Sequence, residues 1–368
     1  MSDSQRFVLN TRTPDSAGAL VCIQSLGRLL NESGRSVTFG DWDNYNQYDV
    51  VIFMAHDAEI DKVRSQNPDI KIGIADPKPS DTKSPQQADF LLVSSIEQRE
   101  VFLKYNPNIF VYYMFPDFSA ERVVHTNKGF VTLAYHGNKV HLDCFQYHLT
   151  PVLNELGKRH TIRLKAIYNV ERLGLWSHGR PDPDLCPVDD LQWYPDCYVN
   201  YLSDIDIGIV PQMSPFPVSM HAAKLFPLHY KRWLLSPLDH MSYYKSSANP
   251  GRIFVFGMFG IPVVSEAIPS TSSLFHDNIN GLQVLTKEGW YDALNRLISS
   301  AHMRAELGER LYEQVVSRYS KEQTFQRFLS FLQQPLQQAI PDLQLSIRRN
   351  SDALFHDFVN KVKRKFFN

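Results

Sequence analysis

Two cations flank the predicted start of a helix near residue 251. The chain reads Lys245-Ser-Ser-Ala-Asn-Pro-Gly-Arg252 here, and an apolar run follows it. The first N–H groups of a helix have no partner within the helix, and the helix dipole favours negative charge at that end. Because Lys245 and Arg252 add two positive charges at the same place, this spacing predicts an anion site that suits a diphosphate.

Polar residues also follow a predicted buried strand at 131–135. The chain continues there with His136-Gly137-Asn138-Lys139 and then His141. Polar side chains directly after a buried parallel strand indicate a cleft. We expect Lys139 to reach a phosphate, and one of the two histidines to bind donor or acceptor. A solvated lysine and a structural loop histidine are the alternatives.

One histidine and three aspartates are the candidates for chemistry in the first third of the chain. His56 ends an apolar strand, and its ordinary pKa of about 6.5 leaves it largely neutral at pH 7. It would hydrogen-bond a sugar or an incoming hydroxyl, or else cap a helix. Asp15 and Asp57 are placed to accept a proton, although each is also a natural helix N-cap. Asp76 is a weaker candidate of the same kind.

The elements that must position these residues alternate along the chain. We expect strands at 7–10, 36–39, 50–53, 70–74, 90–93 and 110–113, with helices at 17–31, 59–66 and 97–105. A second series has strands at 131–135, 162–167, 205–210, 262–265 and 282–285, with helices at 144–156, 287–299, 302–319 and 321–333. Continuous apolar strands separated by helices indicate parallel sheets buried on both faces. Two Rossmann-like domains follow, with the ligand in the cleft between them.

The domain boundaries come from composition and length. We expect an N-terminal domain at 1–118, a second domain at 128–320 and a crossing helix at 321–340, with a polar linker at 117–128. The tail at 341–368 places phenylalanines and lysines at helical spacing. That pattern is typical of a basic interfacial helix, here on an anionic membrane surface, or of a terminal helix docked on the first domain.

The order of these parts resembles that of the GT-B glycosyltransferases. The strand 204–210 before Pro211, the loop and helix of 245–258, the Gly260-Ile-Pro-Val-Val turn and strand, and Asn280-Gly-Leu follow one another as in that group. Each part alone is a weak signal, but the full order is specific. The resemblance implies an α/β GT-B fold of the retaining family 4 type, with two Rossmann-like domains facing across a cleft and C-terminal helices.

The resemblance also implies a function. It implies a hexosyltransferase that moves a sugar from a nucleotide-sugar to a glycan or lipid-linked acceptor, in surface polysaccharide or lipopolysaccharide synthesis, without a bound metal or cofactor. Carried onto this sequence, it assigns catalysis to His56, Lys245 and Arg252. It assigns donor binding to Gly18, His136, Gly137, Lys139, Pro211, Ser246, Asn249, Gly251 and Ile253.

One departure from the family pattern leaves alternatives open. Many retaining members carry two glutamates, E-x7-E, where this chain has Ser247 and Val255. Lys245 and Asn249 would then take over donor contacts. The missing carboxylates leave three alternatives, which are an inverting transferase, a non-catalytic glycan-binding or partner subunit, and a nucleotide-sugar epimerase of the same architecture.

Composition narrows the class of protein. A formal net charge of -1 over 368 residues disfavours a general nucleic-acid binder. Four scattered cysteines suit reduced, cytoplasmic thiols. We find no signal-peptide pattern and no apolar run of the ~20 residues that a spanning helix needs. We therefore expect a cytoplasmic protein, attached at most peripherally to the inner membrane face.

The segment 212–244 is rich in aromatic and basic residues, which suits an oligosaccharide, a lipid surface or a packed helix pair.

Overall fold

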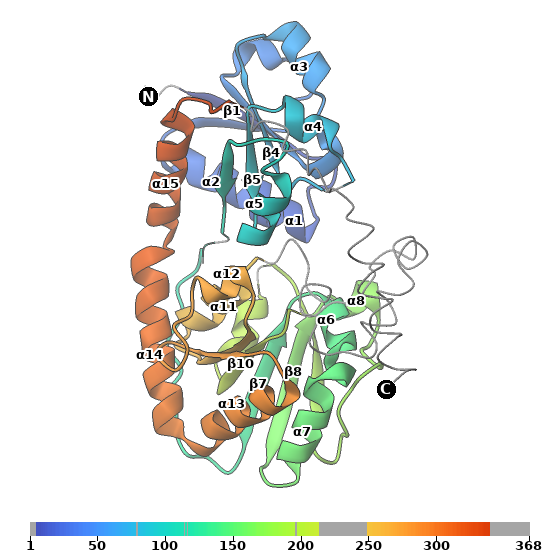
Figure 1. The fold of residues 1–368 in the computed structure, drawn as a ribbon, viewed down its shortest axis with the longest axis vertical. Coiled ribbons are helices and arrows are strands. Elements are labelled where there is room, and N and C mark those ends of the chain that lie inside the picture. The colour runs from blue at the N-terminus through green and yellow to red at the C-terminus, as the bar shows by residue number, and fades with distance from the viewer. Residues whose placement is uncertain are drawn as a thin grey trace, which may run out of the picture.

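The computed structural model describes residues 5–338, apart from residues 79, 114, 116, 196 and 213–248. The described residues form two lobes, with a long helical segment running along one side of both (Figure 1). Each lobe contains a six-stranded sheet whose paired strands are all parallel. The predicted α/β fold with two Rossmann-like halves is thus confirmed. Lys245, Ser246 and the tail at 341–368 lie outside the described residues.

The N-terminal lobe has the strand order β2-β1-β3-β4-β5-β6. Its strands are β1 Arg6–Asn10, β2 Ser36–Phe39, β3 Val50–Met54, β4 Lys71–Ala75, β5 Phe90–Val93 and β6 Ile109–Val111. Its helices are α1 Ala17–Ala19, a π-helical turn Leu20–Gln24, α2 Ser25–Glu32, α3 Ile60–Gln66, α4 Lys83–Gln87 and α5 Ile96–Phe102, with 3-10 turns at Tyr45–Gln47 and Ala55–Asp57.

The C-terminal lobe has the strand order β12-β11-β10-β7-β8-β9. Its strands are β7 Val131–His136, β8 Ile162–Tyr168, β9 Val188–Gln192, β10 Ile207–Val210, β11 Val263–Glu266 and β12 Leu282–Val284. Its helices are α6 Lys139–Asp143, α7 Leu149–Gly157, α8 Val170–Leu173, α11 Gly251–Met258, α12 Pro269–Ser272, α13 Lys287–Ser299 and α14 Ala301–Arg318, with 3-10 turns at Phe145–Tyr147 and Tyr198–Leu202. α15 Lys321–Gln333 follows them.

Two local differences from the expected elements have physical reasons. Strand β9 was not expected, because its sequence Val-Asp-Asp-Leu-Gln is polar and it lies at the sheet edge, largely half-buried. The helix expected at 144–156 is interrupted at His148, whose backbone leaves the helical region at φ -145° and ψ -52°. The ring Nδ1 of His148 lies 3.0 Å from the Cys144 carbonyl oxygen, which holds this interruption in place.

The last helix returns to the first lobe. Phe325, Phe328 and Leu332 of α15 are buried in the same core cluster as strands β1, β3 and β5. The ring centroids of Phe110 and Phe328 lie 5.5 Å apart, so β6 packs directly on this helix. Figure 1 shows α15 along the side of the N-terminal lobe, above α14. The two lobes are therefore joined by the chain twice.

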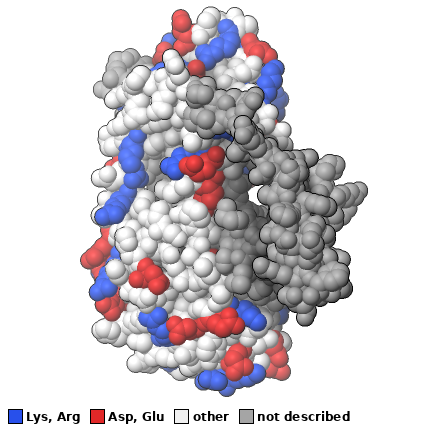
Figure 2. Space-filling model, viewed as in Figure 1, with Lys and Arg blue, Asp and Glu red and all other residues white. Residues whose placement is uncertain are grey.

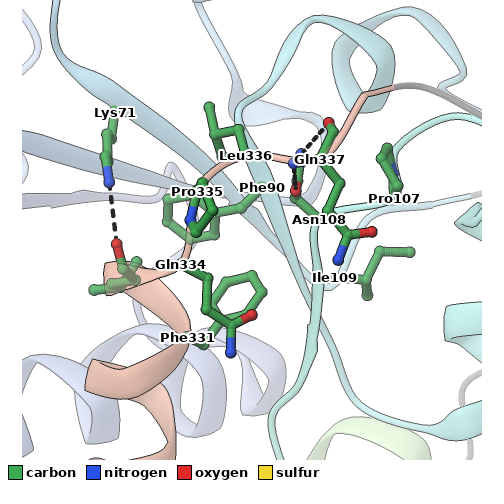
Figure 3. Close-up of a pocket in the computed structure, with 11 residues that line it drawn as sticks. Lys71, Phe90, Pro107, Asn108, Ile109, Phe331, Gln334, Pro335, Leu336 and Gln337 are labelled. Atoms are coloured by element: carbon green, nitrogen blue, oxygen red, sulfur yellow. Dashed lines mark hydrogen bonds between the residues drawn. The ribbon is translucent and has the colours of Figure 1, made fainter.

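The end of α15 is fixed by polar contacts around a small cavity of about 100 Å³ (Figure 3). Lys71 Nζ donates to the carbonyl oxygen of Leu332 at 3.0 Å, at the carboxyl end of the helix. The side chain of Asn108 accepts the Gln337 N–H at 2.7 Å and donates back to the Gln337 carbonyl at 3.3 Å. These contacts anchor the chain to the N-terminal lobe as far as Gln337.

A direct contact also joins the lobes beside the cleft. The Glu97 carboxylate of α5 accepts the Ser270 N–H at 3.2 Å and the Ser270 hydroxyl. The Ser270 hydroxyl oxygen in turn accepts the Ile96 N–H at 3.1 Å. Since Ile96 and Ser270 stand in the first turns of α5 and α12, each helix start is satisfied by the other lobe.

Candidate functional site

A cavity of about 470 Å³ opens at the carboxyl ends of β7, β8 and β9. The strand order of the second sheet reverses between β7 and β10, because the chain adds β8 and β9 on one side of β7 and β10 to β12 on the other. Doubly wound sheets bind ligands at such a switch point. Both lobes contribute to the lining, because Asp15 comes from the loop after β1. The lining residues are Asp15, His136, Gly137, Asn138, Asn169, Arg172, Leu173, Trp193, Tyr198 and Arg252.

Arg252 is one of two arginines that line this cavity, the other being Arg172. It is the second residue of α11, and its Nη2 donates to Gln212 Oε1 at 2.8 Å. Its guanidinium carbon lies 5.6 Å from the centroid of the Tyr135 ring. Nη1 of Arg252 and Nε2 of Gln212 are buried and have no hydrogen-bond partner among the described residues. Buried donors are normally paired, so these two nitrogens are donors that the described residues leave without an acceptor.

His136 is the last residue of β7 and is 4% exposed. Its ring centroid lies 5.0 Å from that of Phe256 and 5.5 Å from that of Tyr198. Burial, together with the positive charge of Arg252, lowers the pKa of His136 to about 3. His136 is therefore neutral at physiological pH, so it can form a hydrogen bond to a ligand but adds no positive charge.

Gly137 allows the approach of Arg252. Its φ of +137° is a conformation that side chains with a Cβ rarely adopt. A Cβ added here would lie 3.0 Å from the Tyr135 hydroxyl oxygen and 3.2 Å from Cδ of Arg252. The residue after β7 is thus shaped to leave room for the arginine that lines the cavity.

Lys139 makes hydrogen bonds within the chain. Its Nζ donates to the carbonyl oxygens of Leu173, Gly174 and Leu175 at 2.8, 3.1 and 2.9 Å. An ammonium group has three protons, and all three are used here. The lysine thereby holds the loop after α8 against the start of α6. Its expected contact with a phosphate stays a prediction.

The start of α11 is partly satisfied by the chain itself. The Gly251 N–H donates to Asn249 Oδ1 at 2.8 Å, and the Ile253 N–H donates to the Pro250 carbonyl at 2.8 Å. The residues Pro211, Gly251 and Ile253 are buried and do not line the cavity. Arg252, and not the residues on either side of it at the helix start, thus lines the cavity.

The N-terminal candidates are spread around the cleft. Asp15 is exposed and lines the cavity, whereas Asp57 accepts the Arg12 N–H at 2.8 Å. Asp76 is paired with Lys78 and also accepts Gln98 Nε2 at 3.0 Å. Of the three carboxylates, Asp15 is the one that faces the cavity.

The remaining two N-terminal candidates lie outside that lining. His56 is exposed, with its Nε2 3.4 Å from Ser80 Oγ. Gly18 packs on β3, since a Cβ there would lie 2.9 Å from the Met54 Cε. Both stay predictions as site residues.

Two aromatic residues of the cavity were not predicted. Trp193 directly follows β9, and its ring lies 5.6 Å from Tyr198 at an interplanar angle of 33°. Tyr198 in turn lies 5.5 Å from His136 at 35°. The three rings form a tilted ladder along the wall of the cavity. The adjacent aromatic residues Trp193 and Tyr194 could have indicated a stacking site in the sequence. They indicate one only if a strand is known to end just before them, and that strand was not predicted.

The described residues show neither a metal cluster nor a spanning helix. No group of three or more His, Cys, Asp or Glu side chains in the described ranges is arranged to hold a metal ion. Within those same ranges, no helix has the length and apolar content to cross a bilayer. Figure 2 shows acidic and basic side chains interspersed on the viewed face.

Comparison by sequence identifies no relative, since neither a family model nor a curated protein matches the chain. Comparison by structure does. Sucrose-phosphate synthase from Thermosynechococcus elongatus matches with a TM-score of 0.59 at 12% identity, over 89% of this chain and 98% of its own. HepE from Anabaena, in complex with UDP-glucose, matches with a TM-score of 0.55 at 10% identity, over 89% of this chain and 99% of its own.

TarM matches with a TM-score of 0.52 at 14% identity, over 77% of this chain. The match spans only 55% of the length of TarM. At these identities the likeness concerns the fold. The fold of this chain is therefore the two-domain α/β fold of the GT-B glycosyltransferases.

Proposed function

We propose that this chain is a glycosyltransferase that binds a nucleotide-sugar in the cavity beside Arg252. The single observation that carries the proposal is the buried Arg252 Nη1, which has no hydrogen-bond partner among the described residues and belongs to a side chain that lines a cavity at the switch point of the second sheet. A diphosphate oxygen would supply the missing acceptor. The complex of HepE with UDP-glucose, a structure of the same fold, supports this choice of ligand.

Each part of a nucleotide-sugar has a suitable wall in the cavity. The diphosphate would lie at Arg252 and Gly137, where the cation and the open backbone meet. The base would stack on Trp193, the outer ring of the aromatic ladder. The sugar would then point toward Asp15 and the N-terminal lobe, where an acceptor would enter.

The chemistry is stabilisation of charge on the departing diphosphate. As the bond between the sugar and the diphosphate breaks, negative charge would grow on the phosphate, and Arg252 would stabilise it without a bound metal. Activity that persists in EDTA would support this part of the proposal. Neutral His136 would donate or accept a hydrogen bond beside it.

Nucleotide binding tests the proposal directly. A nucleoside diphosphate present at a concentration of about a hundred times its Kd would stabilise the native chain by ~2.7 kcal/mol. A thermal-shift screen over UDP, GDP, ADP and CDP would detect this stabilisation. We predict that Arg252→Gln loses most of this stabilisation, because a charged hydrogen bond is removed.

The matched control is Arg318→Gln, which removes an exposed arginine from α14. We expect this variant to respond to nucleotide like the native chain. If no nucleoside diphosphate stabilises the native protein, or if both variants respond equally, the proposal is wrong.

A second candidate is an inverting transferase that uses Asp15 as base. The observation that favours it is that Asp15 is the N-terminal lobe carboxylate that lines the cavity. A base there would take the acceptor proton, whereas a retaining enzyme needs none. The anomeric configuration of the first product, read by NMR, separates the two mechanisms. Retention together with full activity of Asp15→Asn would remove this candidate.

We place the enzyme in the cytoplasm, attached to an anionic membrane surface through the tail at 341–368. The support is the basic and aromatic pattern of that tail. Vesicle flotation of the full chain and of a form ending at residue 340 tests it. Equal binding of both forms to anionic vesicles would refute the attachment.

A further inference from the structure

A second cavity, of about 530 Å³, opens in the N-terminal lobe at the carboxyl ends of β1 and β2. Its walls are mainly apolar, with Leu9 from β1, Phe39 from β2 and Ile23 from the π-helical turn. Two polar side chains, Gln24 and Arg28, complete it from the same helical segment. No residue of this cavity belongs to the site described above.

Phe39 packs on helix α2 at this cavity although its ring is partly exposed. The side chain is 46% exposed. A Cβ added to Gly27 of α2 would lie 2.2 Å from Cζ of the Phe39 ring, so the ring rests on bare helix backbone. An aromatic ring that packs on the helix on one side and is open to water on the other is suited to contact an apolar ligand.

The helix on the other wall departs from regular α geometry. Residues 20–24 form a π-helical turn, in which the Ser25 N–H bonds to the Leu20 carbonyl. Such turns are rare and occur frequently at functional sites. This one contributes Ile23 and Gln24 to the cavity lining.

Gln24 connects the cavity to the candidate active site. Its Nε2 donates to the Pro14 carbonyl oxygen at 2.9 Å. The loop at 11–16 therefore has two functional neighbours, since it gives Thr11 and Pro14 to this cavity and Asp15 to the nucleotide cavity. A ligand bound on one side of the loop lies next to a donor bound on the other.

Arg28 supplies the charge of the cavity. Its guanidinium makes one side-chain hydrogen bond among the described residues, to Ser25 Oγ at 3.3 Å. The nearest carboxylate, that of Asp117, is 3.8 Å away and lies closer to Lys321, at 3.1 Å. Most guanidinium donors thus remain available for an anionic group of a ligand.

We infer that this cavity binds an apolar molecule that carries one phosphate or carboxylate, with its apolar part between Phe39 and Ile23 and its anionic group on Arg28. Resting on the proposed function, we identify this molecule as the part of the acceptor next to the hydroxyl that receives the sugar. The binding itself does not depend on that function.

Binding of simple amphiphiles to the full chain tests the inference. Decyl phosphate and decanoate are titrated by calorimetry below their micelle concentrations, beside the cationic decyltrimethylammonium and the uncharged decyl maltoside. We expect saturable binding of one anionic amphiphile per chain, and weaker binding of the other two. The ratio of decyl phosphate to decanoate affinity identifies which anionic group the site prefers.

Two variants locate the site. Arg28→Gln should weaken the binding of decyl phosphate by about tenfold or more, because a charged hydrogen bond is lost, and should leave the affinity for decyl maltoside unchanged. Phe39→Ser should weaken the binding of both amphiphiles, because the apolar wall is lost. Arg318→Gln, on α14, is the control for a general loss of positive charge. A cooperative thermal transition like that of the native chain shows that each variant is folded.

The inference is wrong if cationic and anionic amphiphiles bind equally, or if Arg28→Gln binds decyl phosphate as the native chain does. If nucleotide binds and decyl phosphate does not, this inference fails and the proposed transferase stands. If decyl phosphate binds at Arg28 and no nucleotide binds anywhere, the site stands and the transferase fails.

Discussion

At the scale of single residues, the site depends on a half-buried cation and the space left for it. Arg252 loses hydration in the cavity, and burial lowers its pKa, although the group stays protonated near neutral pH. Contacts with the Tyr135 ring and Gln212 offset part of this cost. A bound diphosphate would offset more of it, which is why nucleotide and arginine are expected to stabilise each other.

Gly137→Ala tests the space around that arginine. The new Cβ would meet Cδ of Arg252 at 3.2 Å, on a backbone with φ of +137°. We predict a loss of ~1–3 kcal/mol in folding stability from the strained conformation, and weaker nucleotide binding from the displaced arginine. Chemical denaturation and nucleotide titration measure the two effects. Native affinity in a folded Gly137→Ala protein would show that the spacing is irrelevant.

His136 gives a prediction for pH. Its pKa is lowered to about 3 in the folded chain, against about 6.5 when unfolded, so the unfolded state binds the extra proton. The stabilising contribution is therefore complete above about pH 6.5 and is lost as pH falls toward about 3, at up to ~1.4 kcal/mol per pH unit.

The measurement is urea denaturation over that pH range for the native chain and for His136→Gln. We expect the native stability to fall more steeply with acid, by about one proton, because glutamine does not titrate. Parallel curves would contradict a buried neutral histidine.

The sequence allowed prediction of those cavity residues that lie at the end of a strand or the start of a helix. His136, Gly137 and Arg252 were predicted because a strand end and a helix start are visible in the chain, and all three line the cavity. The role of Lys139 could not be foreseen, since the three carbonyls that it binds lie some thirty-five residues away in the sequence. Trp193 was missed for the related reason that its strand was missed.

At the scale of elements, close packing of helices α11 and α14 determines where Arg252 stands. Gly308 of α14 lies against the turn after α11, and a Cβ there would fall 1.9 Å from the Gly260 carbonyl oxygen. Gly257 of α11 is similarly crowded by Val315. The helix that bears the arginine is thus supported by a helix late in the chain.

We predict that Gly308→Ala destabilises the protein by ~1–3 kcal/mol, as overpacking of a rigid contact does. The control is Gly129→Ala, at a position with nothing within 4 Å of the added Cβ. Thermal denaturation of both variants provides the comparison. A Gly308→Ala protein as stable as the control would mean that α14 does not pack as described.

Element prediction succeeded where strands are apolar and failed where they are not. The strands that became β3, β5 and β7 are buried along their whole length, and continuous apolar runs revealed them. Strand β9 is half-exposed and contains two aspartates, one of which, Asp190, is paired with Arg180 at 2.6 Å. Such an ion pair forms only in the folded chain, so it leaves no periodic pattern in the sequence from which the strand could be predicted.

At the scale of the whole molecule, the two lobes meet through α5 and α12 as well as through the chain crossings. Glu97 is the acceptor that satisfies the start of α12 from the opposite lobe. Ser270 lies four residues after Glu266, whose carboxylate accepts a hydrogen bond from the Gln212 N–H. Gln212 in turn accepts a hydrogen bond from Arg252, so this lobe contact is close in sequence to the residues that hold the arginine.

Glu97→Ala would remove that acceptor. We predict a protein of unchanged thermal stability within ~1 kcal/mol, since a single partly exposed hydrogen-bond pair is lost, but with a larger radius of gyration in X-ray scattering as the lobes separate more often. An Arg99→Ala variant on the same helix is the control. Identical scattering from Glu97→Ala and native protein would show that the contact does not hold the lobes.

The most direct test of the central claim is a crystal structure of the full chain with a bound nucleoside diphosphate. We predict a phosphate oxygen within ~3.2 Å of Arg252 Nη1, the usual limit for such a hydrogen bond, with the base against Trp193. A nucleotide bound elsewhere, or a diphosphate that leaves Nη1 unpartnered, would contradict the assignment of this cavity as the donor site.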